Sequence, residues 1–303
     1  MRRTKRGVVK SFDGTKIRYD SNGDGLPLVL VDGIGCDGYV WKYLHRDFGD
    51  NCRTIHMHYR GHGTSDMPAD TNFLSIEDLA DDIAYILDDD EVEDAILVGH
   101  SMGCQVIFEF ARRYPDRVLG LAPICGPYGH ALKTFHDNRL LETIFPFIYP
   151  LFVLTPWVPG AIWRRLVPTE LAYQIATNLE INGRMVEYDD FMPYLKFIGQ
   201  IDLRMFAKML DHCARHTAED FLPTITKPVM IIAGENDTFT PMHVQEKMNE
   251  MIPGSELLIV PQGSHTAPIE MPQLINLRIE RWLLQHFSDR YPEAGVRNNR
   301  ATA

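Results

Sequence analysis

The chain has 303 residues, 45% hydrophobic and 23% charged, which is the composition of a globular protein large enough to bury a substantial core. Its formal net charge of −11 argues against nucleic-acid binding, because that function needs a basic face. The five cysteines have neither paired metal-ligand spacing nor a CxxC motif, so we expect reduced thiols in a cytoplasmic protein. Polar positions follow the basic first residues, and no secretory signal is expected.

The first part of the chain alternates between stretches typical of strands and of helices. Residues 7–12 and 17–20 flank an Asp-Gly turn and predict a hairpin. Residues 75–87 carry apolar positions at helical spacing, with Ser75 as the predicted N-cap, and a later amphipathic helix stops at Pro115. Short apolar runs predict buried strands at residues 26–31, 53–58, 95–98 and 118–124.

The alternation resumes only near the end of the chain. Further strands are predicted at residues 228–233 and 256–260, and further helices at about 241–251 and 274–287. This order predicts an α/β fold with a mostly parallel, twisted sheet covered by helices on both faces. The middle is helix-prone and lacks buried strand runs, so we expect it to form an inserted helical cap. The predicted divisions are a core of residues 1–126 and 226–288, a cap of residues 127–225, and a disordered tail of residues 289–303.

One stretch of the cap resembles a membrane span. Residues 144–163 contain no charged side chain and are long enough to cross a bilayer. Four prolines fall inside this stretch, and each removes an amide donor and opposes a continuous helix. We therefore expect a buried or lipid-facing segment of the cap, not a transmembrane helix.

The strongest motif is a nucleophile elbow. Gly99, Ser101 and Gly103 form the pattern G-x-S-x-G between a predicted strand and a predicted helix. Such a sharp turn presents the serine oxygen at the edge of the sheet, and the glycines keep neighbouring atoms from colliding. The motif predicts that Ser101 is a nucleophile.

A nucleophilic serine needs a histidine base, and the histidine needs a carboxylate to orient it. In this type of fold the chain order is Ser, then Asp or Glu, then His. Asp237 and His265 follow the last two predicted strands in that order, with Glu235 as a weaker candidate acid. Their positions predict a Ser101–His265–Asp237 triad that needs no metal or other cofactor.

The reaction also needs backbone donors for an oxyanion and a pocket for the substrate. We expect the amides of Met102 and Ile34 to donate, because Met102 follows the nucleophile and Ile34 lies in a glycine-rich turn after a strand. Gly33 and His100 are expected beside the substrate, with His100 packed under the elbow. The aromatic residues expected to line the pocket from the cap are Phe145, Phe147 and Trp157.

Together these motifs resemble the α/β-hydrolase superfamily, particularly carboxylesterases and monoacylglycerol-lipase-like serine hydrolases. The resemblance also rests on Arg60-Gly61-His62-Gly63-Thr64-Ser65 and on the Tyr114-Pro115 segment. It departs at Asp32, where relatives usually have histidine before the glycine, and at His58, where many have aspartate.

The resemblance implies a cofactor-free hydrolase that cleaves carboxylic esters through an acyl-enzyme. The apolar cap favours lipophilic, medium-chain acyl groups and a weak association with a membrane surface. A lactonase, a thioesterase, an amidase or a carbon–carbon bond hydrolase would keep the same triad, and a ligand-binding receptor on this fold is a further alternative. Serine at the elbow disfavours epoxide hydrolases and haloalkane dehalogenases, which use aspartate. The sequence does not predict an oligomeric state.

Overall fold

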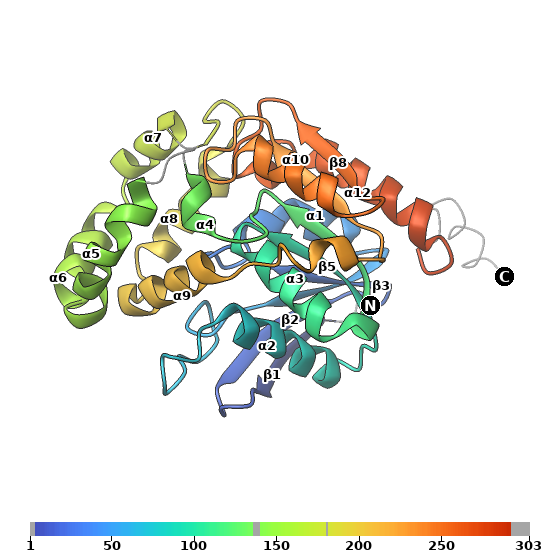
Figure 1. Ribbon diagram of the computed structural model, residues 1–303, viewed down its shortest axis with the longest axis horizontal. Helices are drawn as coiled ribbons and strands as arrows, with labels where there is room; N and C mark the ends of the chain where they lie inside the picture. The colour runs from blue at the N-terminus through green and yellow to red at the C-terminus, as the bar shows by residue number, and fades with distance from the viewer. Residues whose placement is uncertain (1–3, 136–139, 180, 292–303) are drawn as a thin grey trace.

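A single sheet of eight strands organises the chain. The computed structural model describes residues 4–135, 140–179 and 181–291. The strands are β1 (Thr4–Lys10), β2 (Lys16–Asn22), β3 (Leu26–Val31), β4 (Cys52–Met57), β5 (Ala95–His100), β6 (Val118–Ile124), β7 (Met230–Gly234) and β8 (Glu256–Val260). Their order is β1-β2-β4-β3-β5-β6-β7-β8, and the pairs from β4 to β8 are parallel, whereas β2 is antiparallel to both of its neighbours (Figure 1). This confirms the predicted fold class.

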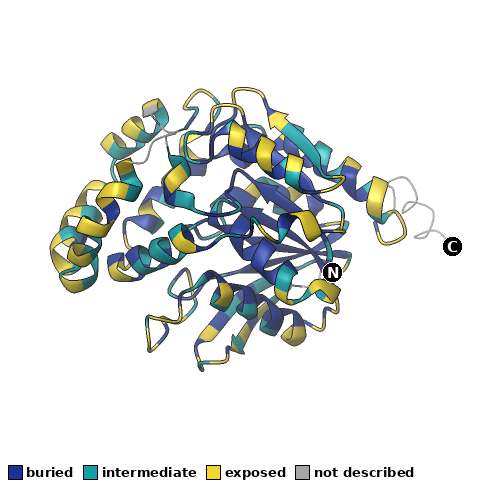
Figure 2. Ribbon diagram, in the orientation of Figure 1, coloured by how far each residue is buried: buried dark blue, intermediate teal, exposed yellow. Residues whose placement is uncertain are grey.

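Helices cover both faces of the sheet, and this explains why the central strands are apolar at consecutive positions. In β3, Val29 and Val31 pack into the hydrophobic cluster on one face, whereas Leu28 and Leu30 pack into the cluster on the other. The helices of the core are α1 (Lys42–Phe48), α2 (Ile76–Asp89), α3 (Met102–Arg113), α10 (Met242–Met251), α11 (Ala267–Glu270) and α12 (Pro272–Phe287). The central strands β3 to β7 are buried at the centre of the molecule, whereas the edge strands β1 and β8 are partly exposed (Figure 2). The sequence had not predicted α1 or α11.

Two polar features fix α2 against the rest of the core. Ser75 is its N-cap, and a capping box joins the Ser75 and Asp78 side chains to each other's backbone amides, as the sequence predicted for Ser75. Asp82 accepts hydrogen bonds from Arg60 Nε at 2.6 Å and Nη2 at 2.8 Å, with both side chains fully buried. This ion pair ties the loop after β4 to α2.

In the described part of the segment between β6 and β7, six helices form the cap. They are α4 (Ala131–Thr134), α5 (Leu140–Leu154), α6 (Trp157–Leu166), α7 (Glu170–Leu179), α8 (Tyr188–Ile198) and α9 (Leu203–Arg215). They gather on one side of the sheet, with α5 and α6 outermost (Figure 1).

The four prolines of residues 144–163 have different effects: the predicted interruption of the helix occurs at Pro156, the N-cap of α6, whereas Pro146 and Pro150 are accommodated inside α5. Pro146 and Pro150 lie inside α5, and both side chains are exposed. The chain bends between α5 and α6. Among the described residues no single helix is long and apolar enough to cross a membrane, whereas α5 and α6 meet the length and composition test only as a pair bent by 99°.

The first residues of the predicted tail are packed against the core. Tyr291 is only 2% exposed, and Arg290 pairs with Asp94 at 2.7 Å. The predicted disorder is therefore wrong for residues 289–291, because an aromatic ring there finds an apolar site. The remainder of the predicted tail, residues 292–303, lies outside the described residues.

Candidate active site

The structure brings Ser101, His265 and Asp237 together in the predicted order. His265 Nε2 lies 2.9 Å from Ser101 Oγ, and His265 Nδ1 lies 3.0 Å from Asp237 Oδ2 and 3.1 Å from Oδ1. Ser101 follows β5, Asp237 follows β7 and His265 follows β8, so all three stand at the carboxyl ends of parallel strands. These contacts allow a proton to pass from the serine oxygen to the imidazole.

The elbow holds Ser101 in a strained backbone conformation. Its φ is 55° and its ψ is −122°, and its amide donates to the Ile124 carbonyl at 3.1 Å. A Cβ at Gly99 would lie 2.5 Å from the Gly103 carbonyl oxygen, and a Cβ at Gly103 would lie 2.2 Å from that of Val31. Only glycine therefore fits at the two positions that the motif requires.

Asp237 is held by its own loop as well as by the histidine. Its carboxylate is 4% exposed and accepts from the amides of Phe239 at 2.8 Å and Thr240 at 3.0 Å, and from the Thr240 hydroxyl at 2.7 Å. The Phe239 ring stacks on the His265 imidazole with centroids 4.6 Å apart. The alternative acid, Glu235, is exposed and accepts from the Gln262 amide instead.

The His265 loop has a second carboxylate that the sequence analysis missed. Glu270 is buried and accepts from the Ser264 amide at 2.6 Å, from the Ser264 hydroxyl, and from the Thr266 hydroxyl at 2.8 Å. These bonds fix the residues on either side of His265. The sequence offered one signal for this role, because Glu270 is an acidic residue in an otherwise apolar segment just before the last helix.

The turn after β3 comes close to Ser101. A Cβ at Gly33 would lie 2.9 Å from Ser101 Cβ, so glycine permits this approach. The Gly35 amide donates to His62 Nε2 at 3.1 Å, and His62 Nδ1 donates to the Arg60 carbonyl at 3.1 Å. Burial lowers the pKa of His62, which keeps the ring neutral and able to accept. His62 thus braces the turn that carries Ile34.

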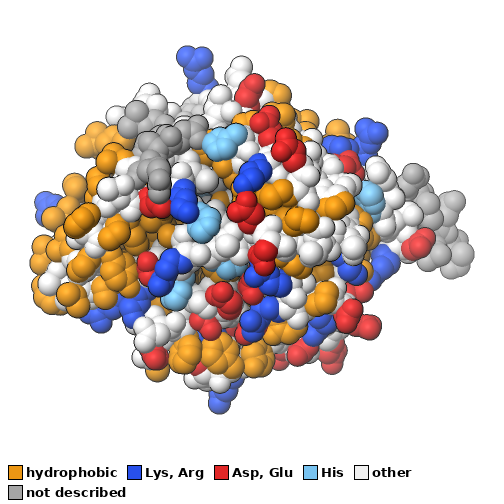
Figure 3. Space-filling model, viewed as in Figure 1, with side chains coloured by type: hydrophobic (Ala, Val, Ile, Leu, Met, Phe, Trp, Pro, Cys, Tyr) orange, Lys and Arg blue, Asp and Glu red, His pale blue; other side chains and the backbone are white. Residues whose placement is uncertain are grey.

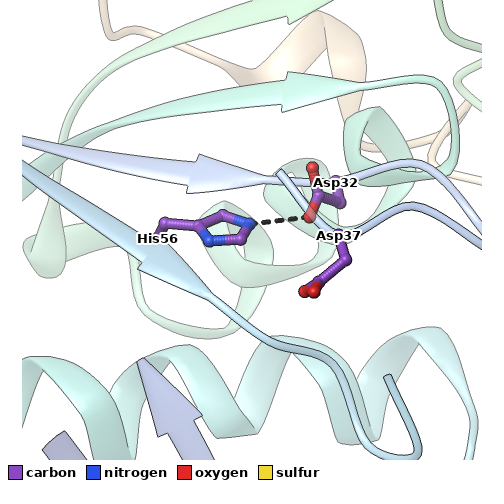
Figure 4. A group of neighbouring side chains, drawn as sticks. All are labelled: Asp32, Asp37 and His56. Atoms are coloured by element: carbon purple, nitrogen blue, oxygen red, sulfur yellow. Dashed lines mark hydrogen bonds and ion pairs between the residues drawn. The ribbon is translucent and has the colours of Figure 1, made fainter. Parts of the chain in front are cut away.

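A second polar cluster, formed by His56 on β4 and the carboxylates Asp32 and Asp37, lies at the same turn (Figure 4). His56 Nε2 lies 2.7 Å from Asp32 Oδ2, which also accepts from the Gly38 amide at 2.9 Å. Burial disfavours a charged His56, but the carboxylates of Asp32 and Asp37 outweigh it and raise the pKa of His56 above its ordinary value. Asp37 pairs with His58 Nδ1 at 2.6 Å.

This cluster includes the only group of potential metal ligands that the described residues bring within mutual reach. Asp32, Asp37 and His56 each offer a ligand atom, and these atoms lie within 4.8 Å of one another. Two of these side chains pair with each other and the third pairs with His58, so we interpret the cluster as a brace for the turn. Asp32 and His58, the two residues that depart from the family pattern, both belong to this network.

A small apolar cavity opens beside the serine. Its volume is about 220 Å³, and Ser101, His265, Ile34 and Met102 all line it. The apolar part of its lining comes from the cap and from neighbouring loops and includes Pro127, Leu132, Phe135, Leu141, Phe206, Leu210 and Phe239. Both residues predicted to form the oxyanion hole thus face the same space as Ser101. A larger hollow of about 590 Å³ lies over β1 and β2, away from these residues.

The other residues predicted for the pocket lie elsewhere. Phe147 is 81% exposed and Trp157 is 62% exposed, because the outer sides of α5 and α6 face away from the core. Phe145 is buried against Tyr149 and does not line the cavity. His100 is also buried and lies beneath the elbow, where its Nε2 contacts the His265 carbonyl at 2.8 Å. Gly33 contributes to the close approach of the turn but not to the lining.

Comparisons with known proteins agree with this fold. Residues 28–276 match the model of the "Alpha/beta hydrolase family". Epoxide hydrolase 4 from Homo sapiens is 25% identical over 285 residues, which cover 89% of this chain and 76% of that protein. The uncharacterized hydrolase YugF from Bacillus subtilis is 23% identical over 89% of this chain and 94% of its own length.

Solved structures share the fold at similar identity. A thermophilic esterase from Thermogutta terrifontis superposes with a TM-score of 0.71 at 24% identity, over 93% of this chain and 99% of that chain. A bromoperoxidase from Bacillus anthracis superposes with a TM-score of 0.76 at 17% identity, over 92% and 99% of the two chains. The family match spans most of the sheet and the whole cap, and the chain therefore belongs to the alpha/beta hydrolase family and is a hydrolase.

Proposed function

We propose that the protein is a cofactor-free serine hydrolase of carboxylic esters. The observation that carries the proposal is the 2.9 Å contact between His265 Nε2 and Ser101 Oγ at the wall of a mainly apolar cavity. A histidine that is hydrogen-bonded to a serine on one side and to a buried carboxylate on the other is the arrangement required to activate the hydroxyl.

The residues would act in two half-reactions. His265 takes the proton of Ser101 as Oγ bonds to the ester carbonyl carbon, and the amides of Ile34 and Met102 stabilise the oxyanion. The alkoxide then leaves with the proton from His265, and an acyl-enzyme remains on Ser101. A water molecule gives a proton to His265 and attacks the acyl carbon, after which the Oγ–carbon bond breaks and Ser101 recovers the proton. Asp237 stabilises the imidazolium in both steps.

The cavity favours one slender acyl chain. Its volume of about 220 Å³ is below the range of about 300–1,000 Å³ found for drug-sized ligands. Leu132, Leu141, Phe206 and Leu210 offer apolar contacts, and each buried methylene contributes about 0.8 kcal/mol. We therefore expect medium-chain esters to be better substrates than acetyl esters.

Relatives named as epoxide hydrolases point to a second chemistry that must be tested. In the family pattern that chemistry uses aspartate at the elbow, and here the elbow carries Ser101. Lactones, thioesters and amides would be attacked by the same triad, and they are the closer alternatives.

A fluorophosphonate probe followed by an ester series tests the proposal. We expect the probe to label the wild type but not Ser101→Ala, and we expect kcat/KM for p-nitrophenyl esters to rise from acetate to butyrate and octanoate. An unlabelled but folded wild type would favour a binding protein. Hydrolysis of styrene oxide without any ester hydrolysis would favour the epoxide chemistry. A steady fall from acetate onward would remove the medium-chain preference.

A further inference from the structure

The outer side of the cap exposes an apolar surface, which we call the apolar cap face. Eleven of the eighteen large hydrophobic side chains that are exposed in the described chain lie between residues 140 and 175. Leu154 is 69% exposed, Trp157 62%, Val158 53% and Ile162 58%. Hydrophobic side chains gather over α5 and α6 in the space-filling view (Figure 3). A contiguous surface of this kind marks an interaction site.

The chemistry of this face favours lipid as its occupant. Residues 143–163 carry no charge, and the Thr155 hydroxyl is used internally, donating to the Leu151 carbonyl at 2.9 Å. Protein interfaces carry about one hydrogen bond per 100–200 Å², for which this face offers few polar partners. A bilayer requires none. Trp157 stands where α5 gives way to α6, and Arg164 and Arg165 are exposed at the end of α6, as expected for anchors at a lipid–water boundary.

The local charge also separates the cap from the rest of the acidic chain. The whole chain has a formal net charge of −11, whereas α5, α6 and α7 together carry two glutamates and two arginines. A headgroup layer with phosphate groups therefore meets a neutral apolar face with cationic residues at its edge, and the acidic surface lies elsewhere.

We propose that the apolar cap face docks the protein on the surface of a phospholipid bilayer. The 99° bend between α5 and α6 prevents the pair from forming one continuous spanning helix. Both helices lie in the interface, with their apolar side chains among the acyl chains and the sheet core in water.

Docking would place the proposed active site next to a lipid reservoir, and this part of the inference rests on the proposed function. Helix α5 carries Leu154 on the bilayer side, whereas Leu141 at its start lines the cavity of Ser101. Helix α5 packs against α9, whose Phe206 and Leu210 line the same cavity. An ester with a lipid chain could pass from the bilayer to the serine along apolar side chains.

Flotation of the full chain with phosphatidylcholine vesicles tests the docking. We expect the wild type to float, and the double variant Leu154→Glu/Ile162→Glu to lose at least about tenfold in the vesicle partition coefficient. The matched control is Leu277→Glu on α12, which is 66% exposed but lies outside the cap. This control should float like the wild type. Raising NaCl from about 0.1 to about 0.5 M should change little, because the attraction is apolar.

Other outcomes would overturn the docking or separate it from the hydrolysis. Failure of the wild type to float, or equal flotation of the double variant, would overturn it. A wild-type dimer that the double variant converts to monomer, without vesicle binding, would assign the face to a second copy of the chain. The Ser101→Ala variant should float as the wild type does, because docking does not need the serine hydroxyl. A wild type that floats but hydrolyses no ester would contradict the proposed function and leave the docking intact. Hydrolysis of a water-soluble butyrate ester should be unchanged in the double variant.

Discussion

The strands of the core and the outer helices of the cap are similarly apolar in sequence, yet they meet different surroundings. All six residues of β3 are buried, whereas Phe145 is the only buried residue among those described in α5. A strand must share its backbone hydrogen bonds with neighbours and is thereby enclosed, whereas a helix satisfies its own and can leave an apolar side outward. The core therefore fixes the geometry of the proposed triad, and the cap supplies only part of the wall of the cavity beside Ser101.

The first test of this difference between core and cap removes the proposed nucleophile. Ser101→Ala should lower kcat for ester hydrolysis by up to about 10⁶-fold, because the triad acts as a unit. Thermal unfolding should be almost unchanged, since the elbow is held by its backbone and glycines. Purified Ser101→Ala with wild-type activity would exclude Ser101 as the nucleophile.

The second test changes the acid of the triad. Asp237→Asn should lower kcat about 10⁴-fold, because an amide can hold the histidine in the wrong tautomer. Glu235→Gln is the matched control, since this exposed side chain contacts the Gln262 amide and not His265. If only Glu235→Gln proved damaging, the acid would have been misassigned.

The third test makes the same substitution in both regions. Leu97→Ala in the buried strand β5 should lower the free energy of unfolding by about 2–5 kcal/mol. Leu154→Ala in the cap should change it by less than about 0.5 kcal/mol, because that side chain is 69% exposed. Urea unfolding measures both values, and equal losses would show that the apolar cap face is covered in solution.

The fourth test uses pH, to which the buried histidines of the core are sensitive. Burial lowers the pKa of His45 and of His100 to about 4 from 6.5, and a second histidine acts in the same direction on each. The pKa of each histidine is lower in the folded state than in the unfolded state. Their contribution to the free energy of unfolding is therefore complete above about pH 6.5 and is lost as the pH falls toward 4. Each contributes on the order of 3 kcal/mol, whereas His56, with its raised pKa, opposes the trend.

Thermal unfolding between about pH 7 and pH 4.5 would measure this loss. His45→Gln should make the pH dependence shallower, because it removes one of the groups that must bind a proton on unfolding. A wild-type stability independent of pH in this range would contradict the assignment of neutral, buried histidines.

The smallest expected effect concerns the brace under the oxyanion turn. His62→Leu removes the acceptor for the Gly35 amide and should lower kcat about 10- to 100-fold through misplacement of the turn. KM should change much less, because His62 does not line the cavity. A rise in KM with kcat unchanged would show that His62 affects substrate binding and not the geometry of the turn.

Much of the fold was readable from local patterns. The strands at residues 26–31 and 118–124 have the predicted limits, and Ser75 caps its helix as predicted. These predictions succeed because apolar runs, caps and glycine turns act over a few residues. The elbow belongs to the same class, since Gly99 and Gly103 are required by contacts within one turn and the adjacent strand.

The sequence by itself determined the sheet, the strained serine turn and the order of the three triad residues. Tertiary structure decided which side chains surround them. His62 accepts from the Gly35 amide in the turn after β3, 27 positions earlier in the chain, and Glu270 folds back onto Ser264, six positions earlier in the His265 loop. The tertiary structure also decided that Phe147 and Trp157 face outward and that Pro146 and Pro150 remain within a helix. Hydrophobicity alone does not specify whether a side chain meets the core, a pocket or a lipid surface, because this depends on which side of its helix packs against the rest of the protein.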